Sequence, residues 1–345
     1  MIRFGCDYAE GCHPRILKAL TQTNLEQTEV YGKDPYCEKA RDMLRKEAQA
    51  PEADVHFVVG GTQANLTVIS ALLRPHQGVI CPETGHINVH ETGAVEATGH
   101  KILAVKTNDG KLTAAQVEAL VNAHYNDGGR EHSVQPGMVC IAQPTETGLL
   151  YTKQELSDLS HICRQYHLPL YLDGARLAYA LAADETFTLP DLARMCDVIC
   201  VGGTKCGALF GEALMILNPE WKTDFRYLIK QRGAMLAKGR LLGIQFLTLF
   251  TDGLYTEIAA QANQYADRIR DALKKSGIPC LRETKANQIF PVLNDDFVQF
   301  LSDRYTFETW EKPDDSRTVL RLCTSWATTA DQIDALVDSI KALRI

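Results

Sequence analysis

Long apolar runs and dense blocks of basic charge are both missing from this sequence. Apolar runs such as residues 213–217 are only a handful of residues long, whereas a helix needs about 20 to cross a bilayer. Lys and Arg total 36 against 43 Asp and Glu, a net charge of −7, and no stretch concentrates Lys and Arg as nucleic-acid binding requires. The first residues, MIRFGCDYAEGC, lack the apolar segment of a secretory signal. We therefore expect a cytoplasmic protein that binds neither membranes nor nucleic acid.

Paired cysteine spacing is also missing. The 11 cysteines are an odd number spread singly along the chain, mostly within apolar text typical of core strands and helices. The densest group, Cys196, Cys200 and Cys206, has neither a C-x-x-C pair nor an intervening histidine, which zinc sites usually provide. We expect reduced thiols in the core and no metal site.

Composition and periodicity predict an α/β protein with two domains. The chain has 345 residues, 45% hydrophobic and 23% charged, which is ordinary for a globular protein and corresponds to about two domains of ~150 residues. Helical segments such as 62–73 and 153–166 separate apolar runs without polar alternation, which are VHFVV, GVIC, KILAV, MVCIA, LPLYL, DVICV and ALMIL. This pattern is typical of a mostly parallel sheet covered by helices on both faces, with its site at the carboxyl ends of the strands.

The pattern changes after residues 241–253. The later elements are expected to be a long helix over 254–275 stopped by Ser276-Gly-Ile-Pro279, apolar strands at 289–293 and 318–323, and a final helix from about residue 329. We expect a large α/β domain over residues 15–250 and a small α+β domain over residues 251–345, with residues 1–14 near the active site.

Lys205 directly follows an apolar run in DVICVGGTKCGALFG, residues 197–211. A surface lysine is the ordinary explanation, but its neighbours are apolar, glycine or hydroxyl residues, so we expect it to be buried. A desolvated amine is a nucleophile able to form Schiff bases. Asp173 likewise ends the run LPLYL, where alone it would be interpreted as a helix N-cap. Together the two residues supply the lysine and the acidic partner that pyridoxal phosphate requires.

The segment VVGGTQANL, residues 58–66, predicts a phosphate site. It is an apolar run that turns through Gly60 and Gly61 and enters a helix at Thr62, where backbone N–H groups and the helix dipole favour an anion. Many tight turns between a strand and a helix look alike. Neither G-x-G-x-x-G nor G-x-x-x-x-G-K-[ST] occurs, so a single phosphate fits better than a dinucleotide or a nucleoside triphosphate.

His86 stands in the His-, Glu- and Gly-rich segment 81–100, just after another apolar run. An imidazole can stack on a flat heteroaromatic ring and transfer a proton near neutral pH. One alternative is a loop residue bonded to backbone, an interpretation that suits His90, Glu91 and His100 better than His86. The other is a metal cluster of Cys81, His86 and His90. We favour the ring contact for His86.

These residues lie in motifs that resemble the threonine aldolase family, within the aromatic amino acid beta-eliminating lyase superfamily of pyridoxal phosphate enzymes. The resemblance runs from about Asp7 to Trp326. It implies a three-layer, mostly parallel sheet of the aspartate aminotransferase type with a smaller C-terminal α+β domain. Its motifs are EVYGKDPY (29–36), GGTQANL (60–66), GHINVHETGA (85–94), LYLDGARLAYA (170–180), GGTKCGALFGEAL (202–214) and LRLCTSW (320–326).

By this resemblance the cofactor is pyridoxal phosphate. Lys205 would carry the Schiff base, His86 would stack on the pyridine ring, and Asp173 would pair with the ring nitrogen. The phosphate would be bound by Gly61, Thr62 and Thr204.

The resemblance also implies how the substrate is held. Arg176, which lies beside the cofactor after the DGA turn, and Arg321 would clamp the α-carboxylate, as suits a planar guanidinium. Tyr31 would approach the site from a neighbouring subunit, because the family forms homodimers or homotetramers with shared active sites.

Three positions depart from the family pattern. Glu146, in T-E-T-G, stands where many members have a histidine near the substrate hydroxyl, so Glu146 would serve as the base, or the base lies elsewhere. The substrate loop, usually S-D-T-x-T-x-P, begins here with Cys6 in C-D-Y-A-E-G-C-H-P. Lys238, in GAMLAKGR, replaces an arginine that contacts the phosphate.

The implied reaction is cleavage of a β-hydroxy-α-amino acid, L-threonine or L-allo-threonine, to glycine and an aldehyde. Because Lys205 and Asp173 serve related reactions equally well, a β-eliminating lyase, a racemase or another enzyme of this cofactor acting on a different amino acid is an alternative. A non-catalytic protein that binds pyridoxal phosphate is a further one.

Overall fold

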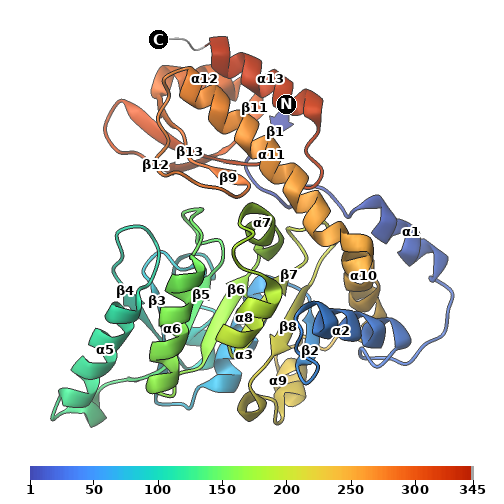
Figure 1. Cartoon of the computed structure of the whole chain (residues 1–345), viewed down its shortest axis with the longest axis vertical. Helices are drawn as coiled ribbons and strands as arrows, with labels where there is room; N and C mark the ends of the chain where they lie inside the picture. Colours follow the sequence, from blue (N-terminus) through green and yellow to red (C-terminus); the bar gives the residue numbers. More distant parts are fainter. Residues whose placement is uncertain (343–345) are drawn as a thin grey trace.

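The computed structural model describes residues 1–342 as a large sheet-based domain with a smaller domain above it (Figure 1). The large domain has a seven-stranded sheet of order β2-β8-β7-β6-β5-β3-β4. Its strands are β2 (Asp54–Val58), β3 (Gln77–Pro82), β4 (Lys101–Val105), β5 (Gln135–Ala142), β6 (Leu170–Gly174), β7 (Val198–Gly202) and β8 (Glu212–Ile216). Only β8 runs antiparallel to its neighbours in this sheet. The mostly parallel sheet and all seven predicted strands are confirmed.

Helices cover both faces of this sheet because successive residues of a strand point to opposite faces. In β5, for example, Val139 and Ile141 join one apolar cluster while Met138 and Cys140 join the other. This explains why the strands lack polar alternation. The first cluster is covered by α2 (Pro35–Glu47), α5 (Ala114–Asn126), α6 (Lys153–Gln165), α7 (Leu177–Ala183), α8 (Leu189–Met195) and α10 (Arg240–Phe250), and the second by α3 (Gly61–Leu72), α4 (His86–Val89) and α9 (Phe225–Gln231).

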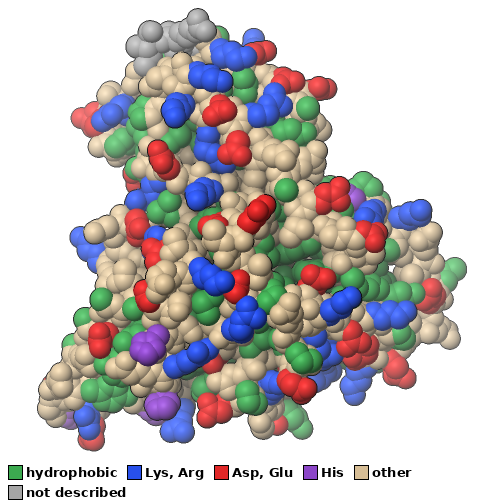
Figure 2. Space-filling view, viewed as in Figure 1, with side chains coloured by type: hydrophobic (Ala, Val, Ile, Leu, Met, Phe, Trp, Pro, Cys, Tyr) green, Lys and Arg blue, Asp and Glu red, His purple; other side chains and the backbone are tan. Residues whose placement is uncertain are grey.

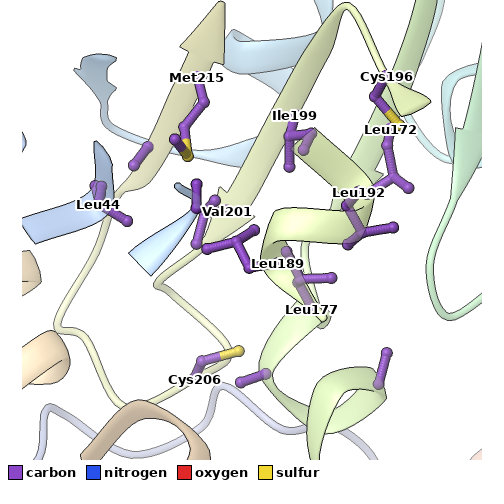
Figure 3. Close-up of a cluster of buried hydrophobic side chains, with 14 of the residues drawn as sticks. Leu44, Leu172, Leu177, Leu189, Leu192, Cys196, Ile199, Val201, Cys206 and Met215 are labelled. Atoms are coloured by element: carbon purple, nitrogen blue, oxygen red, sulfur yellow. The ribbon is translucent and has the colours of Figure 1, made fainter. Parts of the chain in front are cut away.

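The three cysteines considered for zinc lie apart. Cys196 and Cys206 belong to the first cluster, among leucine, isoleucine and valine side chains (Figure 3), whereas Cys200 belongs to the cluster on the opposite face. All three thiols are buried and free. Across residues 1–342, no group of three or more His, Cys, Asp or Glu side chains is arranged to hold a metal ion.

The small domain contains an antiparallel sheet centred on β13 (Arg317–Cys323). Two further short strands pair in parallel, so the start of the chain lies against the small domain. The remaining strands are β9 (Gln288–Ile289), β10 (Val292–Asn294), β12 (Glu308–Glu311), and the pair β1 (Ile2–Arg3) and β11 (Tyr305–Thr306). The predicted strand at 289–293 is two strands, because Pro291 lacks the N–H that a continuous ladder needs.

Helix α11 (Leu254–Lys275) extends from the large domain into the small one and packs against both α7 and α13, which spans Ala330–Ala342 (Figure 1). It ends at the predicted stop, where Gly277 adopts a φ of 72°. The other helices are α1 (Pro14–Gln22), α12 (Asp295–Ser302) and α13 (Ala330–Ala342), with 3₁₀ turns η1 (Glu96–Thr98), η2 (Arg130–His132), η3 (Pro219–Trp221) and η4 (Thr251–Gly253).

The surface carries both signs of charge. On the face shown in Figure 2, Lys and Arg side chains are interspersed with Asp and Glu over both domains. Among the helices within residues 1–342, none combines the length and apolarity needed to cross a membrane.

Candidate active site

The carboxyl ends of the parallel strands meet at one edge of the large sheet. Asp173 lies near the end of β6, Lys205 follows β7, and His86 begins α4 shortly after β3. Glu146 follows β5 and lines one pocket together with His86 and Asp173. The structure therefore brings these four sequence-predicted residues to the edge where open α/β sheets usually bind ligands.

A chain of hydrogen bonds joins His86 to Asp173. His86 Nδ1 and Glu91 Oε1 are 2.8 Å apart, and Asn65 Nδ2 donates to the same Glu91 oxygen at 2.6 Å and to Asp173 Oδ2 at 3.1 Å. The Tyr171 hydroxyl donates to Asn65 Oδ1 at 2.7 Å, which fixes the orientation of the amide. The imidazole and the carboxylate at the end of β6 are thus held by one network.

Glu91 is bonded to His86 and favours its protonated form. Its side chain is fully buried, and its second oxygen, Oε2, has no hydrogen-bond partner among the described residues. Burial alone would lower the pKa of His86, but the hydrogen bond to Glu91 and the nearby Glu146 and Asp173 carboxylates raise that pKa above its ordinary value. When neutral, His86 directs Nδ1–H at Glu91 and keeps a lone pair on Nε2. The expectation that Glu91 is an ordinary loop residue is therefore wrong.

Close backbone packing shapes the turn that carries Lys205. A Cβ atom on Gly202 would lie 2.4 Å from the Ala175 carbonyl oxygen, so only glycine fits there. The Tyr179 hydroxyl donates to the Lys205 carbonyl oxygen at 2.6 Å. Lys205 is only partly buried, and its Nζ lies 5.6 Å from the centre of the Tyr8 ring. Lys205 was expected to be buried, and the structure shows that it is only partly so, because it lies in the turn that follows β7.

Glu212, the first residue of β8, holds the same turn from the neighbouring strand. Its Oε2 accepts a hydrogen bond from the Gly203 N–H at 2.8 Å. Burial raises the pKa of Glu212 to about 7, which outweighs the hydrogen bonds from Thr204 and Gly203 that lower it. The Thr204 hydroxyl also accepts the Gly211 N–H at 3.0 Å, so this predicted phosphate ligand stabilises the turn as well.

The amino end of α3 has the features of an anion site. No side chain among the described residues caps this end, which leaves its first N–H groups available. Apart from its chain neighbours and the nearby backbone of α3, a Cβ atom on Gly60 or Gly61 would meet no atom of residues 1–342 within 4 Å, and Thr62 is exposed. Open space beside uncapped N–H groups fits a single phosphate.

Both arginines predicted to bind a carboxylate are already paired with acidic side chains. Arg176 donates from Nε and Nη2 to buried Asp7, at 2.7 and 3.0 Å. Arg321 donates to Glu308 on the adjacent strand. Cys6, the predicted substrate contact, is partly buried and precedes Asp7 in the chain. Asp7 is a site residue that sequence reasoning missed, although it lies within the segment already compared with the substrate loop.

Tyr31 and Lys238 lie on a different surface of the same chain. The Tyr31 N–H donates to the Ala237 carbonyl at 3.0 Å, and the Lys230 Nζ lies 4.8 Å from the Tyr31 ring centre. Lys238 is exposed next to Ala237. The structure therefore brings Tyr31 and Lys238 close to each other, and neither lines the pocket that contains His86 and Asp173.

The sequence is similar to known proteins over most of its length. Residues 8–296 match a family model described as beta-eliminating lyase. The chain belongs to the beta-eliminating lyase family. A low-specificity L-threonine aldolase from Pseudomonas sp. is 31% identical over 318 residues, which are 88% of this chain and 89% of that protein.

Solved structures extend this family assignment. A threonine aldolase of Leishmania major has a TM-score of 0.96 and 44% identity, with 100% of both chains covered. A Thermus thermophilus aspartate aminotransferase, at 15% identity, a TM-score of 0.72, and 99% and 91% coverage of the two chains, shares the fold alone. The resemblance drawn from the motifs and the aspartate aminotransferase type of fold are both confirmed.

Proposed function

We propose that this member of the beta-eliminating lyase family is a pyridoxal phosphate-dependent lyase that cleaves L-threonine and L-allo-threonine to glycine and an aldehyde. The similarity to threonine aldolases over most of the chain supports this activity. The observation that carries the proposal is the network from His86 through Glu91 and Asn65 to Asp173, at the sheet edge that also carries Lys205.

The large domain offers one group for each part of the cofactor. Pyridoxal phosphate, when bound, supplies an electron sink for the carbanion left by carbon–carbon cleavage. Lys205 would hold it covalently, Asp173 would keep a proton on the pyridine nitrogen, and His86 would stack on the ring. The uncapped end of α3, with Gly61 and Thr62, and the Thr204 turn would receive its phosphate.

The substrate would lie between the sheet edge and the small domain. Arg176 and Arg321 would bind its α-carboxylate, with Cys6 nearby. Glu146 would take the proton of the β-hydroxyl, because it is 8% exposed and lines the same pocket as His86. His86, whose pKa is raised, would hold a proton on Nδ1 shared with Glu91.

Tyr31 and Lys238 would act on the site of a second subunit. Tyr31 and Lys238 lie close together on a surface that does not line the pocket of their own chain. This placement is consistent with a homodimer or homotetramer whose active sites are shared. We further propose that the protein is cytoplasmic, with a large domain over 15–250 and a small domain over 251–345.

Covalent trapping tests the cofactor assignment. Borohydride reduction of the cofactor-loaded protein, followed by peptide mass mapping, should place the pyridoxyl group on Lys205. Lys205→Ala should show no such adduct, while Lys274→Ala, at an exposed position of α11, should keep it on Lys205. An adduct on another lysine, or one that persists in Lys205→Ala, would contradict the proposed site.

A further inference from the structure

Asp7, Arg176 and Asn287 come together from three distant parts of the chain. Asp7 follows the N-terminal strand, Arg176 follows β6 of the large sheet, and Asn287 precedes β9 of the small domain. Asp7 Oδ2 accepts hydrogen bonds from Arg176 Nε at 2.7 Å and from Asn287 Nδ2 at 2.8 Å, and Asp7 Oδ1 accepts one from Arg176 Nη2 at 3.0 Å. Three donors thus converge on one carboxylate.

This cluster is buried and well tied to its surroundings. Asp7 and Asn287 are each 0% exposed and Arg176 is 6% exposed. Asn287 Nδ2 also donates to the Thr324 carbonyl at 2.8 Å, which anchors the amide to the segment after β13. Although burial raises the pKa of a carboxyl, Arg176 and Asn287 lower the pKa of Asp7 below its ordinary value, so Asp7 stays ionised at neutral pH.

The pairing uses only one edge of the guanidinium. Asp7 takes Nε and Nη2 of Arg176. Within residues 1–342, Arg176 Nη1 donates no hydrogen bond, and solvent can reach this atom. A guanidinium presents its donors in a fixed planar fork, so holding one edge also fixes the direction of the other.

We propose that Asp7 is a positioning residue that orients Arg176 so that its free Nη1 edge receives the α-carboxylate of the substrate. The inference rests on the proposed function, because it assumes an amino acid ligand. Asn287 completes the arrangement by holding Asp7 from the small domain. The free edge of Arg176 is therefore correctly directed only when the N-terminal segment and both domains are in place.

Two amine ligands distinguish an effect on carboxylate binding from a general effect on the fold. Glycine and methylamine differ only in the carboxylate, and the binding of each to the cofactor-loaded protein is followed by the change in the cofactor's absorption spectrum. In Asp7→Asn, we expect the Kd of glycine to rise about 10- to 100-fold, as for loss of a hydrogen bond to a charged group. The Kd of methylamine should stay within about two-fold of wild type.

Two further variants complete the test. Asp252→Asn removes the carboxylate from the exposed Arg15–Asp252 ion pair and should leave both affinities unchanged. Asn287→Ala keeps the Asp7–Arg176 pair and should weaken glycine alone, by about 3- to 10-fold, because it removes one neutral donor. This second variant keeps the proposal testable if Asp7→Asn does not fold.

Three results would overturn the inference or its basis. Unchanged or tighter glycine binding in Asp7→Asn would mean that Asp7 only neutralises Arg176. Equal weakening of glycine and methylamine would mean a general structural effect. A wild-type protein that binds methylamine but not glycine, or neither, would contradict the proposed function itself.

Discussion

Replacing Glu212 by glutamine should change how the stability of the protein depends on pH. Glu212 is 3% exposed, and burial raises its pKa from 4.5 to about 7. A carboxyl whose pKa is higher in the folded state stabilises the fold below its unfolded pKa, and this contribution is lost as the pH rises through the folded pKa. The change from 4.5 to about 7 corresponds to about 3 kcal/mol. Glutamine does not titrate, but it keeps an oxygen that can accept the Gly203 N–H.

Urea unfolding at several pH values between about 5 and about 8 measures this difference. The free energy of unfolding of Glu212→Gln minus that of wild type should rise with pH across this window, by at most about 3 kcal/mol. Glu131→Gln, at an exposed position, should give a flat difference. If the Glu212→Gln difference is also flat, or falls as the pH rises, the assignment of a buried carboxyl that is protonated in the fold is wrong.

Two further predictions concern the pocket. Glu91→Gln should lower the pKa of His86, because it removes the carboxylate that favours the imidazolium, and NMR titration of His86 measures this change. An unchanged or higher pKa of His86 would mean that Glu91 does not favour the imidazolium. Glu146→Gln should lower kcat for L-threonine by about 100-fold or more with a much smaller change in KM, as expected for loss of a general base. Steady-state kinetics measure both constants, and an unchanged kcat would mean that another residue is the base.

The sheet could be predicted because each strand forms an unbroken apolar run. Strands buried on both faces need no polar alternation, and the seven runs all became strands. The antiparallel direction of β8 was missed, although it could have been predicted from length. Residues 203–211 are too few for the crossover of roughly a dozen residues that two parallel strands require.

The site was only partly predictable for a different reason. Lys205, Asp173 and His86 stand directly after apolar runs, so their place at the sheet edge follows from local sequence. The contacts of Glu91 with Asn65, and of Asp7 with Arg176, join residues 26 and 169 positions apart, which local patterns do not reveal. The burial of Lys205 was misjudged because neighbouring residue types do not report how open a strand end is.

Product analysis tests the central claim, carbon–carbon cleavage of β-hydroxy-α-amino acids, most directly. The cofactor-loaded protein is incubated with L-threonine, L-allo-threonine and L-phenylserine, and glycine, aldehyde, pyruvate and ammonia are measured together, with Lys205→Ala as the inactive control. The account predicts glycine and aldehyde in equal amounts, without pyruvate or ammonia. Pyruvate and ammonia would indicate β-elimination instead, and no product from any of the three substrates would contradict the proposed activity.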